Sequence, residues 1–306
     1  MKIRFALPAL AAVAALALAG CTNTDGAEGG ANSIGPSGLV ESVTVDEAAA
    51  ALLPADIAES GKLVMGSDGD YFPNEFKSED GKTLTGWGIE LAEAVSAKLG
   101  LTPEWEVLDF DSIIPRIEEG VVNMGASSFT DNLKRQESVD FVNYYNAGTL
   151  WAAKTGANID PDDACGLTVA VQQGTVQERT ELPERSAKCE AAGKDPIEIL
   201  PFDGQAAATN AVVNDQADAF SADSPVTIGA VIELGGVLEA QGEAFASEPY
   251  GFAVQKGSAM TQAVQAAVQS LMDDGTYLKI LEHWGAEGGA ITEATVNAGT
   301  SSGEEE

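Results

Sequence analysis

One stretch indicates how the whole chain is organised: Gly125-Ala-Ser-Ser-Phe-Thr-Asp-Asn-Leu-Lys-Arg-Gln-Glu-Ser-Val-Asp-Phe141. An apolar run at residues 121–125 leads into it and predicts a strand. That strand is followed by three hydroxyl side chains, Ser127, Ser128 and Thr130. Asp131 and Asn132 are good N-cap residues, so a short helix carrying Arg135 is predicted next. A strand end, a helix start and an arginine together suit an anion of carboxylate size. The alternative is an ordinary strand–loop–helix with a surface arginine.

Composition describes an acidic, globular chain. Its 306 residues include 48 Asp and Glu against 16 Lys and Arg, which gives a formal net charge of −32. Hydrophobic residues make up 44%, enough for a sizeable core, and the length allows two domains. A surface this negative repels phosphate backbones, so the composition argues against nucleic-acid binding.

The first 20 residues predict an export signal. Lys2 and Arg4 precede an apolar stretch at residues 5–19, which is shorter than the ~20 residues of a membrane span. The sequence Leu18-Ala-Gly-Cys21 resembles the bacterial lipobox, in which the cysteine is lipidated and becomes the mature N-terminus. We therefore expect a signal peptide at 1–20 and a lipid on Cys21 that anchors the protein to the outer face of the cytoplasmic membrane. A plain secretory signal with a chance cysteine is the alternative.

Residues 21–60 are predicted to be the lipidated cysteine and a flexible spacer, with a short helical lead-in at 45–60. Beyond Cys21 the chain has two cysteines, Cys165 and Cys189. In an oxidising compartment such a pair predicts a disulfide. The single histidine, His283, is far from both in the sequence, so we expect neither a metal site nor a Cys–His nucleophile, and no cofactor.

The strand–helix order βαβαβ occurs twice along the chain, which predicts two α/β units with mostly parallel strands. Extended crossings are expected at residues 147–154 and 248–254. The predicted organisation is lobe 1 at 61–149 plus 252–285, lobe 2 at 150–251, and a disordered acidic tail at 286–306. Two lobes joined by two crossings make a hinged clamshell with its ligand site in the cleft.

Over about residues 60–285, the sequence resembles the bacterial extracellular solute-binding proteins of family 3, the substrate-binding components of polar amino-acid ABC transporters. The resemblance implies the periplasmic-binding-protein-like clamshell. It rests on the joint order of short landmarks: Gly61-Lys-Leu-Val, Trp87-Gly-Ile-Glu-Leu-Ala, Asp109-Phe-Asp-Ser-Ile-Ile-Pro115, Arg135 with Val139-Asp-Phe141, Gly174-Thr175, Asp218-Ala-Phe-Ser-Ala-Asp223, Tyr250-Gly-Phe-Ala-Val-Gln-Lys256, and Asp274-Gly-Thr-Tyr277 with Trp284.

The resemblance implies a ligand site for a free amino acid. Arg135 with Ser128 and Thr130 would bind the α-carboxylate, because a planar bidentate cation and nearby donors suit that group. Asp223, at a strand end in the second lobe, would bind the α-ammonium. Further expected contacts are the aromatic faces of Tyr71 and Phe110 beside the side chain, Thr175 at the carboxylate, and Asp68 at the ligand side chain.

Two departures from the family pattern affect the carboxylate end. Asn132-Leu-Lys-Arg135 stands where the family often has Thr-Pro-Glu-Arg, and Val176 stands where a second hydroxyl is common. Val176 then has only its backbone N–H to contribute. Neither change removes a charge that the site needs.

The resulting hypothesis is a monomeric, lipid-anchored binding protein that captures an amino acid by hinge closure and delivers it to a permease and ATPase. Asp68 and the nearby Asp70 favour a cationic or amide side chain over an acidic one. We do not expect an enzyme, although cyclohexadienyl dehydratases resemble the same family and remain an alternative. A sensory ligand-binding module is a third interpretation.

Overall fold

The computed structural model describes residues 35–302. The predicted signal peptide, the lipidated Cys21 and residues 303–306 lie outside this range. Within it, none of the helices has the length and apolar character required to cross a bilayer.

An eight-stranded sheet runs through the structure in the order β5-β1-β6-β11-β7-β10-β8-β9, and a small sheet of three strands, β2-β3-β4, lies beside it. The large sheet contains β1 (Lys62–Ser67), β5 (Thr102–Val107), β6 (Met124–Thr130), β7 (Val139–Lys154), β8 (Thr168–Gln172), β9 (Glu198–Phe202), β10 (Ala219–Asp223) and β11 (Leu238–Gln255). The small sheet contains β2 (Asp70–Tyr71), β3 (Glu75–Lys77) and β4 (Leu84–Thr85).

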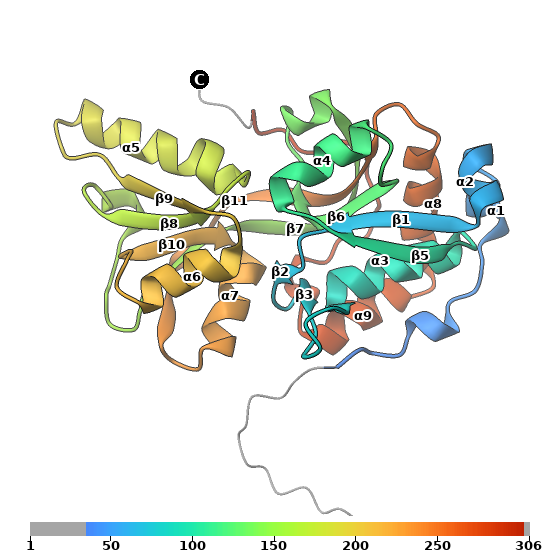
Figure 1. The fold of residues 1–306 in the computed structure, drawn as a ribbon, viewed down its shortest axis with the longest axis horizontal. Coiled ribbons are helices and arrows are strands. Elements are labelled where there is room, and N and C mark those ends of the chain that lie inside the picture. The colour runs from blue at the N-terminus through green and yellow to red at the C-terminus, as the bar shows by residue number, and fades with distance from the viewer. Residues whose placement is uncertain (1–34, 303–306) are drawn as a thin grey trace, which may run out of the picture. The chain divides into compact units, whose positions relative to one another are not determined.

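Helices cover both faces of the large sheet, and α1 and α2 lie beyond the end of β1 (Figure 1). The helices are α1 (Glu47–Ala50), α2 (Ala55–Ser60), α3 (Trp87–Lys98), α4 (Phe110–Glu118), α5 (Leu182–Ala191), α6 (Gln205–Val213), α7 (Ser224–Glu233), α8 (Met260–Asp273) and α9 (Thr276–Trp284). Single turns of other helix types are η1 (Val40–Ser42), η2 (Arg135–Glu137), η3 (Pro161–Asp163), η4 (Gln177–Glu181) and η5 (Glu287–Gly289).

The central strands β7 and β11 are shared by two lobes. They pair antiparallel from Val139↔Gln255 to Lys154↔Leu238. On one side, β6, β1 and β5 with α3, α4, α8 and α9 form the first lobe; on the other, β10, β8 and β9 with α5, α6 and α7 form the second (Figure 1). The two predicted crossings lie inside these strands and pair with each other, for example Ala147↔Glu248.

The apolar pattern of α3 illustrates how the sequence builds the first lobe. Ile89, Ala92, Val95 and Leu99 recur at helical spacing, which places them on one face, and all four are at most 2% exposed. Trp87 at the start of the helix is fully buried as well. At about 25 cal/mol per Å² of apolar surface, burial of such a face is a main source of the lobe's stability.

The structure differs from the prediction at both ends of the opening stretch. Strand β6 extends to Thr130 rather than ending near Gly125, so the hydroxyl residues belong to the strand. The helix predicted to carry Arg135 is only the three-residue turn η2, in which the Asn132 side chain accepts from the Arg135 backbone N–H at 2.8 Å. Val139 follows at once with β7, which leaves no room for a longer helix.

The predicted disordered tail is ordered over residues 286–302. It makes antiparallel bridges to β7 at Val142↔Val296 and Tyr145↔Ala290. The polar and acidic composition of this segment suggested disorder, but its backbone finds hydrogen-bond partners on β7. The short helical lead-in predicted at residues 45–60 contains the helices α1 and α2.

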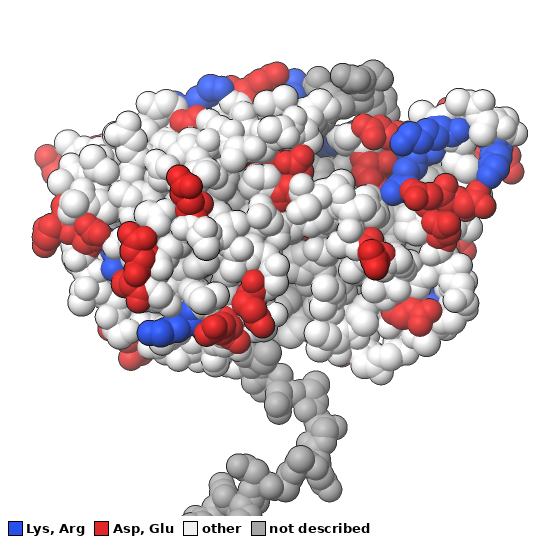
Figure 2. Space-filling model, turned by 180° about the vertical axis from the view of Figure 1, so that it is seen from behind, with Lys and Arg blue, Asp and Glu red and all other residues white. Residues whose placement is uncertain are grey.

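Acidic side chains are spread over both lobes on the face shown in Figure 2. Several form exposed ion pairs, such as Lys62–Glu104 and Lys134–Glu137. Exposed pairs of this kind contribute about 0–1 kcal/mol each. The strong negative charge is therefore a surface property and does not identify the ligand.

Candidate functional site

A small cavity lies where the ends of β6, β8 and β10 approach one another. Seven of the eight residues that the sequence proposed for ligand binding line it: Tyr71, Phe110, Ser128, Thr130, Arg135, Thr175 and Asp223. The cavity has a volume of about 20 Å³, which is room for about one water molecule. An amino acid is larger, so its entry requires the lobes or the lining side chains to move.

Arg135 joins the two lobes at this cavity. Its Nη1 donates to the Thr130 carbonyl at 2.7 Å, and its Nη2 donates to the Gly174 carbonyl of the second lobe at 3.1 Å. The guanidinium carbon lies 5.4 Å from the centre of the Phe110 ring and 5.6 Å from that of Phe129. Burial lowers the pKa of Arg135 to about 10, with Asp223 opposing the shift, so the side chain is charged at neutral pH.

The loop that receives Arg135 requires glycine. Gly174 has φ +78°, and a Cβ on it would lie 2.7 Å from the Cβ of Asp111 in the first lobe. The next residue, Thr175, donates its hydroxyl to the Gln172 carbonyl at 2.8 Å and accepts from the Glu178 N–H at 3.2 Å. In this structure, the hydroxyl of Thr175 therefore shapes the loop.

Asp223, at the end of β10, is held by two donors. Tyr250 donates its hydroxyl to Oδ2 and Gln177 donates its amide to Oδ1, each at 2.7 Å. Burial raises the pKa of Asp223, and both hydrogen bonds and Arg135 oppose the shift. Neither Gln177 nor Tyr250 was among the predicted ligand residues. The one sequence signal for Gln177 is its position in the predicted helix start after Gly174-Thr175.

Ser128 has a buried partner that the sequence did not reveal. Its hydroxyl lies 2.9 and 3.1 Å from the two carboxyl oxygens of Glu75, and it accepts from the Asn74 amide at 2.9 Å. Glu75 is fully buried, and this burial raises its pKa to about 8. The Ser128 side chain is thus engaged with Glu75 behind the cavity.

Asp68 does not line the cavity but lies directly behind it. Gln172, which does line the cavity, donates its amide to Asp68 Oδ2 at 2.6 Å. Burial raises the pKa of Asp68 to about 7. The carbonyl oxygen of the Gln172 amide is buried and has no hydrogen-bond partner. Nearby, Asp70 accepts from the Ala206 N–H at 2.8 Å, at the start of α6.

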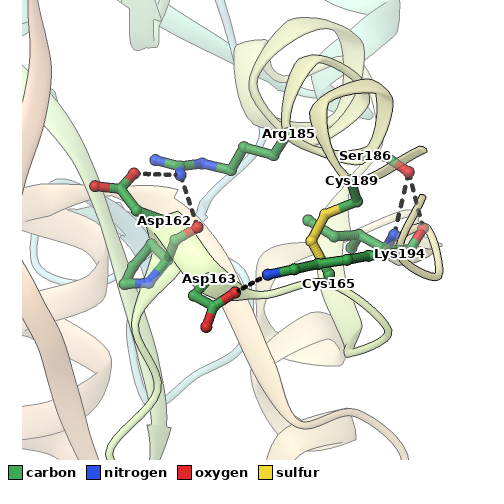
Figure 3. Close-up of a disulfide and its surroundings, with 9 residues drawn as sticks. Asp162, Asp163, Cys165, Arg185, Ser186, Cys189 and Lys194 are labelled. Carbon is green, nitrogen blue, oxygen red and sulfur yellow. Dashed lines mark hydrogen bonds and ion pairs between the residues drawn. A yellow bond between two sulfur atoms is a disulfide. The ribbon is translucent and has the colours of Figure 1, made fainter. Parts of the chain in front are cut away.

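The predicted disulfide is present in the second lobe. Cys165 and Cys189 are bonded and link the segment before β8 to α5 (Figure 3). Ion pairs flank it, from Arg185 to Asp162 at 2.8 Å and from Lys194 to Asp163 at 2.6 Å. A disulfide closing a loop of this size stabilises a fold by about 3 kcal/mol. It anchors the C-terminal turn of α5, and the turn that precedes this helix, η4, carries Gln177.

Known proteins resemble this chain over most of its length. The arginine-binding protein ArgT of Corynebacterium glutamicum is 41% identical over 249 residues, which cover 81% of this chain and 82% of ArgT. The structure of an ancestral arginine-binding protein bound to arginine matches with a TM-score of 0.67 and 31% identity, covering 73% of this chain and 98% of that one. An ancestral amino acid-binding protein, AncCDT-1, described as a precursor of cyclohexadienyl dehydratase, matches with a TM-score of 0.67 and 32% identity, covering 75% and 97%.

These solved structures confirm the two-domain periplasmic-binding-protein fold. The sequence profile of the bacterial extracellular solute-binding proteins, family 3, matches residues 63–287. That range contains both lobes and every residue of the cavity described above. The chain therefore belongs to the bacterial extracellular solute-binding proteins of family 3.

Proposed function

We propose that this protein binds a cationic L-amino acid, with arginine as the first candidate, as the binding component of an ABC importer. The observation that carries the proposal is the placement of Arg135 and Asp223, of opposite charge, on one small cavity between the lobes. A zwitterion needs both charges. The arginine-binding relatives support the choice of ligand.

The α-carboxylate would bind Arg135, whose planar guanidinium suits a bidentate contact. It would replace the Gly174 carbonyl as the partner of Nη2, because both cannot occupy the same position. The α-ammonium would bind Asp223, whose carboxylate is already oriented by Gln177 and Tyr250. A ligand that contacts both lobes favours the closed state by its differential affinity for it.

The side-chain preference follows from the carboxyl groups near the cavity. Asp68 and Glu75 are buried, and burial disfavours their charged forms until a cation compensates. A guanidinium or ammonium group supplies that compensation, whereas a carboxylate side chain would be repelled. The unpartnered Gln172 oxygen also favours a ligand that offers N–H groups.

A panel of the twenty amino acids tests this function by isothermal titration calorimetry on the purified protein. We expect arginine to bind most tightly, lysine, histidine and glutamine more weakly, and aspartate and glutamate not at all. Micromolar binding corresponds to about −8 kcal/mol. Binding of acidic amino acids alone would refute the cationic preference, and no response to any amino acid would refute the function itself.

The affinity for arginine is expected to rise with pH between about 6 and 8. The pKa values of Asp68 and Glu75, about 7 and about 8, leave both carboxyls partly protonated at neutral pH. A cationic ligand favours their charged forms, so binding releases protons and is weaker at low pH. Each released proton changes the affinity by up to about tenfold per pH unit. Titrations in two buffers of different ionisation enthalpy measure the proton release; a pH-independent affinity without proton release would contradict this prediction.

The remaining parts of the proposal concern the setting of the protein. We infer export, a lipid on Cys21 at the outer face of the cytoplasmic membrane, a monomeric state, and delivery of ligand to a permease and ATPase. Mass spectrometry of the native protein tests the lipid on Cys21. We propose binding rather than catalysis, and absence of turnover of prephenate or arogenate is the expected result of the corresponding assay.

A further inference from the structure

The C-terminal strap (residues 290–301) extends beyond the part of the chain that matches the family. It runs antiparallel along β7, where the Asn143 N–H donates to the Thr295 carbonyl at 2.8 Å and the Asn297 N–H to the Phe141 carbonyl at 3.0 Å. The Asn297 side chain adds a bond from the Phe141 N–H at 2.7 Å. The strap is thus paired with β7, which follows the connection that contains Arg135 (residues 131–138, here the Arg135 loop).

Past β7, the strap reaches the Arg135 loop through Asp131. This carboxylate is fully buried. Its Oδ2 accepts from the Gly299 N–H at 2.9 Å and from the Asn143 amide at 3.0 Å, and its Oδ1 accepts from the Gln136 amide at 2.7 Å. One side chain therefore connects the strap, β7 and the residue after Arg135.

The strap also holds the loop directly on both sides of Arg135. The Leu133 N–H donates to the Ser301 carbonyl at 2.9 Å, and the Gln136 amide donates to the Gly299 carbonyl at 3.0 Å. The fit at Gly299 leaves no room for a side chain, because a Cβ there would lie 2.0 Å from the Asp131 carbonyl oxygen.

We propose that the C-terminal strap and Asp131 position Arg135 for the ligand α-carboxylate. Arg135 is the first residue of the three-residue turn η2, which offers little rigidity of its own. Fixing the residues on either side reduces the conformational entropy lost when the guanidinium is ordered around a carboxylate. The proposal rests on the amino-acid-binding function given above, and it makes Asp131 a positioning residue that acts through Arg135.

The test compares L-arginine with L-argininamide, which keeps the ammonium and guanidinium groups but lacks the carboxylate. Gly299→Val should push the strap off Asp131, and Asp131→Asn should replace one of the two acceptor oxygens with an NH2 group that cannot accept from the surrounding donors. Gly288→Val is the matched control, because a Cβ at Gly288 has no heavy atom within 4 Å. Titration calorimetry gives the affinity ratio of the two ligands for each variant.

We expect wild type and Gly288→Val to prefer arginine strongly and by the same factor. In Gly299→Val and Asp131→Asn, arginine affinity should fall by about tenfold, the size of ~1.4 kcal/mol, while argininamide affinity stays nearly constant. Amide hydrogen exchange over residues 131–137 should also become faster in these variants. A smaller ratio of arginine affinity to argininamide affinity in these two variants than in wild type supports the positioning role.

If the variants bound arginine and argininamide more weakly by the same factor, or if neither affinity changed, the inference would be overturned and the strap would be a purely structural element. If Gly299→Val does not fold, Asp131→Asn decides, since its amide is nearly the same size as the carboxylate. Wild-type protein that binds neither ligand would instead refute the proposed function. The two failures are therefore distinguishable.

Discussion

Arg135→Ala is expected to reduce amino-acid affinity to near the limit of detection. The guanidinium is the one cation among the residues that line the described cavity, and it lies half-buried between the lobes. Removing one partner of a buried charge pair costs about 2–5 kcal/mol, which is roughly 30- to 5,000-fold in affinity. Titration calorimetry with L-arginine measures the loss.

Two companion variants make the Arg135 result specific. Arg135→Lys keeps the charge but not the planar fork, so we expect an intermediate affinity. Arg116→Ala removes a guanidinium that forms an exposed pair with Glu119, and it should leave binding unchanged. An Arg135→Ala protein that binds arginine within threefold of wild type would show that the carboxylate binds elsewhere.

Asp223→Asn is expected to weaken binding by a similar 2–5 kcal/mol while leaving the fold of the free protein intact. The amide keeps the size of the side chain and can still accept a hydrogen bond from Gln177 or Tyr250. It has no charge to offer the α-ammonium. Because burying the carboxylate is itself costly, the thermal midpoint of the ligand-free protein should change little or rise.

The control for Asp223→Asn is Asp215→Asn. Asp215 is 81% exposed and pairs with Lys154 at the surface, so its loss of charge should alter neither affinity nor melting temperature noticeably. Calorimetry and thermal unfolding with and without arginine give both quantities. If Asp223→Asn retained the full ligand-induced rise in melting temperature, the assignment of the ammonium to Asp223 would be wrong.

The secondary-structure order could be predicted because it depends on local periodicity. The apolar spacing at Ile89, Ala92 and Val95 fixed the buried face of α3, and those residues are buried. Boundaries were less accurate. Strand β6 continues through Ser127 and Ser128 because pairing with its neighbours, including Phe129↔Gly251 of β11, overrides the turn preference of small polar residues.

The cavity was predictable only in part. Seven of its residues were identified from motif order, but Gln172, Gln177 and Gln205 also line it. The Glu75–Ser128 and Asp68–Gln172 contacts join residues separated by 53 and 104 positions. Periodicity indicates the face on which a residue lies, but it does not indicate which distant side chain that face meets.

By itself, the sequence determined the alternation of strands and helices, the cysteine pair, and an arginine and an aspartate of complementary charge on separate α/β units. Tertiary structure alone decided which groups surround those charges. It brought Tyr250 and Gln177 within hydrogen-bond distance of Asp223. It also placed the C-terminal strap beside the Arg135 loop, where the Gly299 N–H donates to Asp131. The physical reason is that a buried polar group must find a hydrogen-bond partner, and only the folded chain determines which partner is within reach.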